Sequence, residues 1–81
     1  MNDDQLRQIV LQGLTEIAPE IEGEEITPDV NFRDQLDIDS MDFLNFIIAL
    51  HEELKVDIPE ADYSQLFDLN GAVAYLKAKV D

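Results

Sequence analysis

A run of sixteen residues from Ser40 to Lys55, free of glycine and proline, constrains the fold of this chain more than any other segment. Its apolar residues recur at three- and four-residue steps, which predicts an amphipathic α-helix. The stripe that this spacing places on one face consists of Phe43, Phe46, Ile47, Leu50 and Leu54. Because such a stripe has to be buried, the run predicts a helix that faces the core of a helical domain.

The start of this helix is rich in acids. Asp39 is a favourable N-cap, and Asp42 would occupy the third helical position, where a carboxylate interacts well with the positive end of the helix dipole. If Asp39 is the cap, Ser40 lies on the first turn and its hydroxyl is free to face solvent. Because a boundary predicted from sequence shifts by about two residues, Ser40 as the cap remains the alternative.

A second apolar stripe lies roughly 100° or more around the same helix from the centre of the first. It consists of Met41, Leu44 and Ile48. Two interpretations are open. Apolar residues at helical spacing are usually core, so burial under a long loop is one interpretation. The other is an exposed ridge rimmed by acids, which would mark a protein-binding site.

The remaining segments complete an all-α fold, a four-helix bundle with a long first loop and a short third helix. The first helix begins at Asp3 and Asp4 and ends before Pro19, and the short helix lies between Pro59 and Phe67. At 81 residues the chain is expected to form one domain, residues 1–81, with a limited core.

Residues 19–38 form the long connection, and Asp68 is expected to cap the last helix. The apolar residues that pin this connection onto the core are Ile26, Val30, Phe32 and Leu36. The inward face of the last helix consists of Val73, Leu76 and Val80, with Ala72, Ala74 and Tyr75 beside it. No segment predicts a strand.

The net charge of −14 is concentrated in the middle of the chain. Residues 16–68 contain sixteen of the nineteen acids but only two of the five bases, Arg33 and Lys55. Nucleic acid and anionic membranes are therefore poor partners, whereas basic grooves on other proteins, or divalent cations bound loosely by clustered carboxylates, are good ones. A merely solubilising acidic surface is the alternative.

The sequence indicates the cellular location only indirectly. The polar, acidic start lacks the features of a signal peptide, no apolar run reaches membrane-spanning length, and the chain has no cysteine. A cytoplasmic protein without membrane insertion is the default expectation.

The sequence offers no catalytic or metal-binding constellation. His51, the one histidine, is eleven residues from Ser40 on the same predicted helix, roughly 16 Å along its axis. A nucleophile and its base need hydrogen-bond distance, so the two cannot form a hydrolase pair. A calcium loop starting at Asp37 would lack its sixth-position glycine and twelfth-position glutamate, and no zinc ligand set exists.

The tripeptide Asp39-Ser40-Met41 stands at a predicted helix start in an acidic four-helix chain. This combination resembles the acyl carrier protein family, which has Asp-Ser-Leu at this place. The similarity covers nearly the whole chain. It continues through Asp42, the run Ile48–Leu54, Ile58-Pro59-Glu60, Ala72-Val73 and Tyr75-Leu76.

The resemblance implies that Ser40 carries 4′-phosphopantetheine, derived from coenzyme A and attached through a phosphodiester, whose thiol holds acyl groups as thioesters. It implies that Asp39 supports the modification by helping a holo-synthase to place its magnesium ion. The protein itself would be a non-catalytic, monomeric carrier with no metal site of its own.

The resemblance also implies the partners. They would be holo-acyl carrier protein synthase or another phosphopantetheinyl transferase, and acyl-transferring and synthase enzymes with basic docking patches. The surface that these enzymes meet would consist of Met41, Asp42, Leu44, Ile48, Glu52, Glu53, Glu60 and Asp62. An acidic face speeds the encounter with a basic partner.

Departures from the family pattern leave the pathway open. Met41 replaces the usual leucine, Ile38 precedes Asp39 where small residues are common, and Phe67-Asp68-Leu69 replaces a threonine-rich turn. Asn45 and His51 stand where acids are frequent. We therefore expect a carrier for fatty acid, lipid or polyketide biosynthesis, or a carrier specialised for polyketide, lipid or aminoacyl transfer. An unmodified acidic helical adaptor that binds basic proteins is the alternative.

Overall fold

Residues 1–21 and 25–80 are described by a computed structural model. Their regular secondary structure consists of helices, which turns and extended segments connect. The elements are α1 (Asp3–Ile17), η1 (Pro19–Ile21), α2 (Phe32–Gln35), α3 (Ser40–Leu54), η2 (Glu60–Leu66) and α4 (Leu69–Val80), where η denotes a 3₁₀ helix. No strand occurs in these two stretches. The prediction of an all-α bundle with a long first connection and a short third helix is confirmed.

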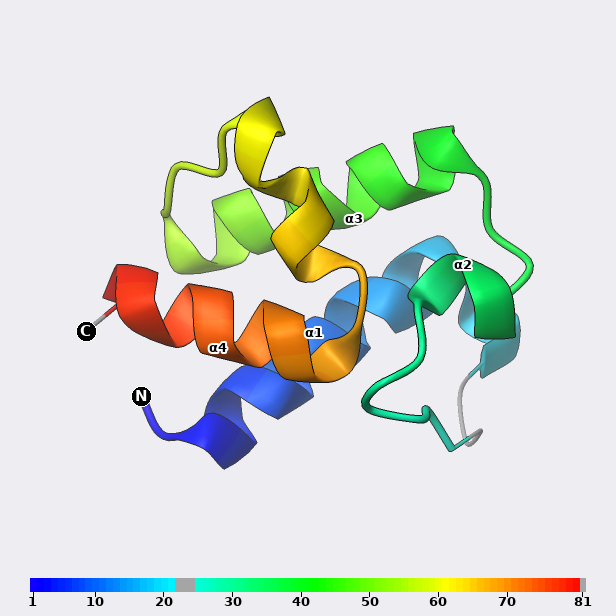
Figure 1. Cartoon of the computed structure of the whole chain (residues 1–81), viewed down its shortest axis with the longest axis horizontal. Coiled ribbons are helices and arrows are strands. Elements are labelled where there is room, and N and C mark those ends of the chain that lie inside the picture. The colour runs from blue at the N-terminus through cyan, green and yellow to red at the C-terminus, as the bar shows by residue number, and fades with distance from the viewer. Residues whose placement is uncertain (22–24, 81) are drawn as a thin grey trace.

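The three long helices are arranged around α1. This helix packs against both α3 and α4, and α3 and α4 run in the opposite direction to it (Figure 1). The short helix η2 packs against α4, and in that view it crosses α3 on its way to the start of α4. The N-terminus and the C-terminal end of α4 lie at the same end of the molecule, where Lys77 Nζ donates a 2.8 Å hydrogen bond to Asp3.

One cluster of apolar side chains forms the core. Every long helix contributes, and the largest fully buried side chains are Phe32, Phe46, Leu6, Leu14, Leu50, Leu66, Leu76 and Val10. The predicted stripe of α3 faces this core, with Leu54 at its edge and half-buried. Gly13 faces α3 across this core, and a Cβ at this position would be in ordinary contact with the Phe46 ring, at 3.4 Å.

The described part of the long first connection contains buried residues and a helical turn. Phe32 and Leu36 are buried, and Ile26 and Val30 are half-buried, so all four predicted anchors contact the core or its edge. The segment between them contains the single turn α2, which the sequence did not predict because one turn has no periodicity to detect. Residues 22–24 of the predicted connection lie outside the described residues.

The last helix begins as predicted. Asp68 accepts a 2.7 Å hydrogen bond from the backbone N–H of Gly71. Ala72, Val73 and Leu76 are buried, whereas Ala74 is exposed rather than beside the core. The acidic residues thus order the start of both α3 and α4.

A buried tyrosine joins α4 to η2. Tyr75 is 9% exposed, and its hydroxyl donates a 2.7 Å hydrogen bond to Asp62. Burial, followed by this hydrogen bond, raises the pKa of Tyr75 from its ordinary value of 10 to about 12. The folded state therefore retains the phenolic proton more strongly than the unfolded state does.

Replacing Tyr75 with phenylalanine should lower the free energy of unfolding by about 1–2 kcal/mol, because the half-buried carboxylate of Asp62 loses its donor. Tyr63→Phe is the matched control, since the Tyr63 hydroxyl has no hydrogen bond within the described residues. Urea unfolding of both variants measures the difference. Equal losses would contradict the role assigned to this hydrogen bond.

The same tyrosine should make stability depend on alkaline pH. Its pKa is higher in the folded state, so its contribution is complete below pH 10 and is lost as the pH rises from 10 toward 12. Wild-type stability should consequently fall more steeply across this range than that of Tyr75→Phe, as measured by urea unfolding at each pH.

Candidate functional site

The start of α3 is fixed by a reciprocal pair of aspartates. Asp39 is the N-cap, and its side chain accepts a 2.9 Å hydrogen bond from the backbone N–H of Asp42. The Asp42 side chain in turn accepts a 3.2 Å hydrogen bond from the backbone N–H of Asp39. The predicted cap is confirmed, and Ser40 is the first helical residue rather than the cap.

Ser40 is exposed and its hydroxyl is unused. No hydrogen bond joins this hydroxyl to any residue in the described stretches, because Asp39 already satisfies the capping position. The backbone N–H groups of Ser40 and Met41 have no intrahelical acceptor, as expected at the first turn of a helix. A reagent that approaches from solvent can therefore reach the Ser40 oxygen without breaking an existing contact.

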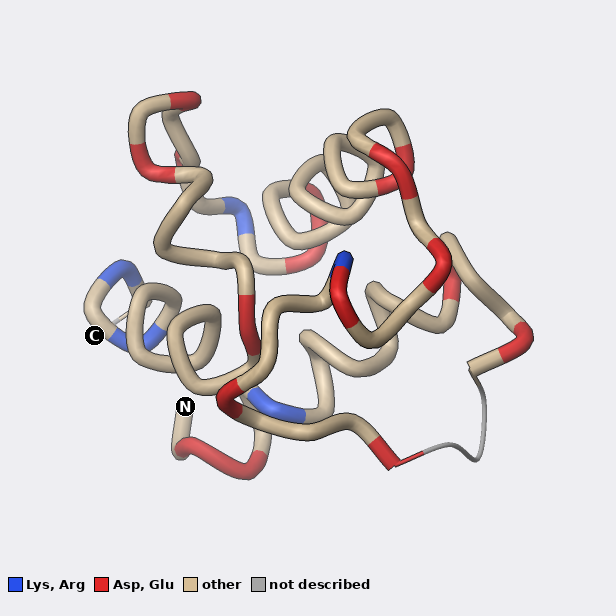
Figure 2. Tube along the Cα trace, turned by 45° about the vertical axis from the view of Figure 1, so that its right-hand side comes forward, with Lys and Arg blue, Asp and Glu red and all other residues tan. Residues whose placement is uncertain are grey.

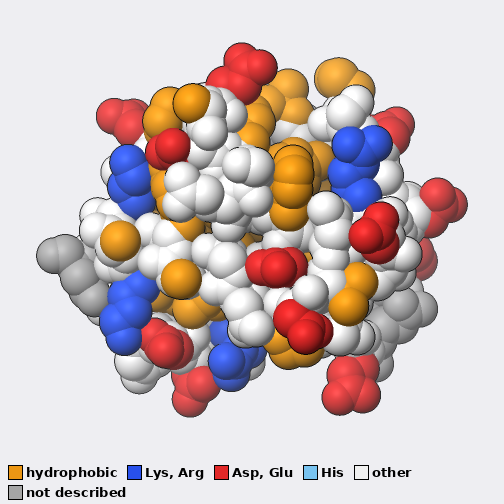
Figure 3. Space-filling model, in the orientation of Figure 1, with side chains coloured by type: hydrophobic (Ala, Val, Ile, Leu, Met, Phe, Trp, Pro, Cys, Tyr) orange, Lys and Arg blue, Asp and Glu red, His pale blue; other side chains and the backbone are white. Residues whose placement is uncertain are grey.

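A largely apolar hollow of about 420 Å³ opens beside Ser40. It lies between α2, α3 and η2 and is lined by Arg33, Ser40, Met41, Phe43, Leu44, Glu60, Tyr63 and Phe67. Figure 3 shows hydrophobic side chains gathered in this region of the surface, with a basic side chain at one edge. The ring of Phe43 forms the inner wall, with its centroid 5.3 Å from that of Phe67 and 6.3 Å from that of Tyr63.

The second apolar stripe of α3 is at the surface. Met41 is 62% exposed and Ile48 is 44% exposed, while Leu44 between them is half-buried. Of the two interpretations of this stripe, the exposed ridge is the one that the structure supports. The described part of the long first connection leaves Met41 and Ile48 exposed, while its Phe32 and Leu36 are buried in the core.

The acids predicted to border this ridge lie in different surroundings. Glu52 and Glu60 are exposed, and Asp42 is half-buried in the cap of α3. Asp62 is half-buried and engaged by Tyr75, so it also holds η2 against α4. The tube in Figure 2 shows acidic positions along most of the chain and basic ones mainly near its two ends.

Glu53 lies apart from the other predicted acids. It is about 140° around α3 from Ile48, and it lines a small groove with Ile9 and Glu16 of α1. Glu52, by contrast, is only about 40° from Ile48. The structure therefore brings Glu52 to the ridge and places Glu53 on the α1 side of the helix.

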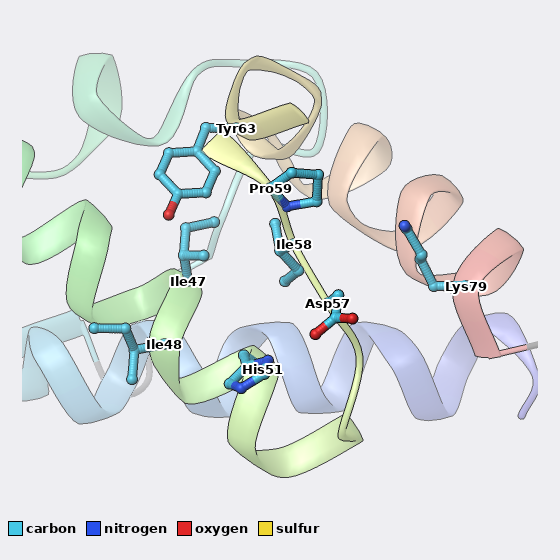
Figure 4. A pocket seen from close by; sticks show the side chains of 8 residues that line it. All are labelled: Ile47, Ile48, His51, Asp57, Ile58, Pro59, Tyr63 and Lys79. Atoms are coloured by element: carbon cyan, nitrogen blue, oxygen red, sulfur yellow. The ribbon is translucent and has the colours of Figure 1, made fainter. Parts of the chain in front are cut away.

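His51 lies at the far end of the ridge, where a second hollow of about 490 Å³ separates α3 from the segment that follows it. Figure 4 shows His51 and Ile48 on α3, with Asp57, Ile58 and Pro59 on the opposite wall. His51 Nδ1 is 2.6 Å from the carbonyl oxygen of Val56, which can only accept, so Nδ1 carries the proton. His51 thus fixes the turn after α3.

Three residues that line the Ser40 hollow were not predicted as site residues from the sequence: Arg33, Tyr63 and Phe67. Tyr63 also lines the hollow near His51, so this one side chain borders both hollows. The sequence marks Arg33 only as a base among acids, and the distances along the chain from Ser40 give no sign of proximity. Only the packing of α2 and η2 beside α3 brings the three together.

Within residues 1–21 and 25–80, no group of three or more histidine or acidic side chains is placed to hold a metal ion. None of the described helices combines the length and the apolar character that crossing a membrane requires.

Known proteins match almost the whole chain. The family model for the phosphopantetheine attachment site matches residues 4–76. The chain is 36% identical over 72 residues to an acyl carrier protein of Kineococcus radiotolerans, covering 85% of this chain and 89% of that protein. It is 34% identical over 74 residues to the meromycolate extension acyl carrier protein of Mycolicibacterium aurum, covering 88% and 76%.

The chain belongs to the acyl carrier protein family. The group that this family binds covalently is 4′-phosphopantetheine, and the family works with phosphopantetheinyl transferases and biosynthetic enzymes. The prediction of the family and of its cofactor is confirmed.

The residues around Ser40 fit this group. The exposed hydroxyl offers an oxygen for a phosphodiester, and the first turn of α3 offers backbone N–H groups and the positive end of a dipole to a phosphate. Asp39 and Asp42 carry charge of the same sign as the phosphate, but each already accepts a hydrogen bond from the backbone.

Removing the cap should weaken the start of α3. Asp39→Ala loses the hydrogen bond to the Asp42 N–H and should lower the free energy of unfolding by about 0.5–2 kcal/mol. Asp37→Ala is the matched control, because Asp37 is exposed and has no hydrogen bond within the described residues. If urea unfolding gave the same loss for both variants, the cap would not be what stabilises this helix start.

Proposed function

We propose that Ser40 of this acyl carrier protein is the attachment residue for 4′-phosphopantetheine. The observation that supports this most directly is the division of roles at the start of α3: Asp39 caps the helix, so the Ser40 hydroxyl is exposed and unbonded. The other serine of the chain, Ser64, is exposed on η2 and has no comparable helix start beside it. Asp39 supports the modification both by ordering this turn and, through its exposed carboxylate, by meeting the transferase's magnesium ion.

The chemistry required of the chain is limited to one oxygen. Ser40 Oγ attacks the phosphorus of coenzyme A that bears the pantetheine, forms a new P–O bond and gives its proton to the transferase. The bond to the other phosphate breaks, and adenosine 3′,5′-bisphosphate leaves. The attached group supplies a thiol, which the cysteine-free chain lacks, and that thiol holds acyl intermediates as thioesters.

The ridge of α3 is the proposed docking surface. Met41, Leu44 and Ile48 offer apolar area next to Ser40, and the adjoining acids attract enzymes with basic patches. The acids assigned to this surface are Asp42, Glu52, Glu60 and Asp62. One oxygen of the Asp62 carboxylate also accepts the hydrogen bond from Tyr75. Glu53 is better placed for a partner that reaches around to α1.

We propose that the protein is a single, monomeric, non-catalytic carrier domain that serves enzymes building acyl chains in the cytoplasm. Two of its relatives are named for meromycolate extension, which supports a role in fatty acid or lipid biosynthesis over polyketide assembly. The second candidate is an unmodified adaptor that uses the same ridge. The exposed ridge alone would serve such an adaptor, so covalent modification is the property that separates the two functions.

Modification is tested by intact mass after incubation with coenzyme A and a promiscuous phosphopantetheinyl transferase. The wild-type chain and Ser64→Ala should each gain one phosphopantetheine, whereas Ser40→Ala should gain none. Circular dichroism should show nearly the same helix content for all three, because neither serine side chain forms a hydrogen bond within the described residues. A wild-type chain that stays unmodified would favour the adaptor, and a modified Ser40→Ala would refute the assigned site.

Docking is tested by a pair of neighbouring glutamates that differ only in the face of α3 they occupy. Glu52→Gln should lower kcat/KM for loading by about 2–5-fold at low ionic strength, and the loss should shrink with added salt. Glu53→Gln removes the same charge from the α1 side and should have a much smaller effect. Equal losses would show that net charge, and not the ridge, governs the encounter.

A further inference from the structure

We infer that Arg33 binds the phosphate of the group attached to Ser40, an inference that rests on the function proposed above. Arg33 belongs to the single turn α2, seven residues before Ser40, and it lines the same hollow as Ser40. Among the described residues, it is the only basic one in the lining of that hollow. A phosphate formed on the Ser40 oxygen would therefore share this hollow with one guanidinium.

The backbone that carries Arg33 is held in place by several contacts. The backbone N–H of Phe32 donates a 2.7 Å hydrogen bond to the carbonyl of Phe67, and the Phe32 ring is fully buried, with its centroid 5.6 Å from that of Phe46. The side chain of Asn31 accepts a 2.8 Å hydrogen bond from the N–H of Arg33. The position of Arg33 beside the hollow is thus set by the core and not by its own side chain, which is exposed.

The guanidinium of Arg33 is also unpaired in a strongly acidic region. Residues 16–68 contain sixteen acids, yet Arg33 makes no ion pair or side-chain hydrogen bond with any residue of the described stretches. Arg7 and Lys77, by comparison, pair with Asp4 and Asp3. An arginine kept among acids without pairing to them is available for an anion that arrives from outside the chain.

A phosphodiester suits this cation. Its two non-bridging oxygens match the planar fork of donors on a guanidinium, which forms parallel, charge-assisted hydrogen bonds with such groups. The carboxylates of Asp39 and Asp42 repel a phosphate at Ser40, and the positive charge of Arg33, which lines the same hollow as Ser40, offsets this repulsion. The inference assigns Arg33 the role of holding the fixed end of the arm while the rest of it stays free.

The experiment compares melting temperatures of the unmodified and loaded forms at low ionic strength, with loading verified by intact mass. The difference in melting temperature between the loaded and the unmodified form is determined for wild type, Arg33→Gln and Lys55→Gln. Lys55 is the matched control, because it is the other base in residues 16–68 and lies about 22 Å along α3 from Ser40. The change on loading should be less favourable by about 1–5 °C in Arg33→Gln than in wild type, and the same as wild type in Lys55→Gln.

A second measurement needs no variant. The Nε–H resonance of Arg33 should shift when the wild-type protein is loaded, whereas that of Arg7 should not, because Arg7 lies on α1 and pairs with Asp4. Arg33→Lys keeps the charge but loses the planar fork, and its change on loading should fall between those of wild type and Arg33→Gln.

The outcomes separate this inference from the proposed function. A wild-type chain that takes up no group would overturn both. A wild-type chain that loads normally, with an unmoved Arg33 resonance and the same thermal change in all variants, would overturn the role of Arg33 alone and leave Ser40 as the attachment residue.

Discussion

The burial of one stripe of α3 fixes how that helix is rotated, and the rest of the site depends on that rotation. Phe43, Phe46, Ile47 and Leu50 are in the core, where Gly13 of α1 faces Phe46 and Leu50. With this face turned inward, Met41 and Ile48 have to point outward. The exposed ridge is therefore a consequence of core packing, since a helix that carries two apolar stripes can bury only the one its neighbours cover.

The polar chemistry of the site follows from which residue caps α3. A serine is as good an N-cap as an aspartate, so capping would compete with the proposed modification for the Ser40 hydroxyl. The reciprocal hydrogen bonds of Asp39 and Asp42 cap the helix and leave the serine exposed on the first turn. The same two carboxylates therefore stabilise the helix start and add to the negative charge around Ser40.

The long first connection has a structural role that its composition does not indicate. Its buried Phe32 anchors α2 beside the start of α3, and the hydrogen bond from Phe32 to Phe67 ties that turn to the segment between η2 and α4. Three chain segments that are distant in sequence thereby enclose the hollow beside Ser40. The arrangement surrounds the proposed attachment residue with aromatic walls and one cation, within an otherwise acidic surface.

The sequence by itself determined the three long helices and η2, and it favoured Asp39 and Asp68 as caps, because each of these depends on interactions among residues close together in the chain. Periodicity placed the buried stripe of α3, and the spacing of Asp39 and Asp42 placed its cap. Only the tertiary structure decided that the second stripe is exposed, that Glu52 and Glu53 serve different faces, and that Arg33, Tyr63 and Phe67 meet beside Ser40. These features depend on which surfaces of separate helices pack together, and local spacing carries no information about that.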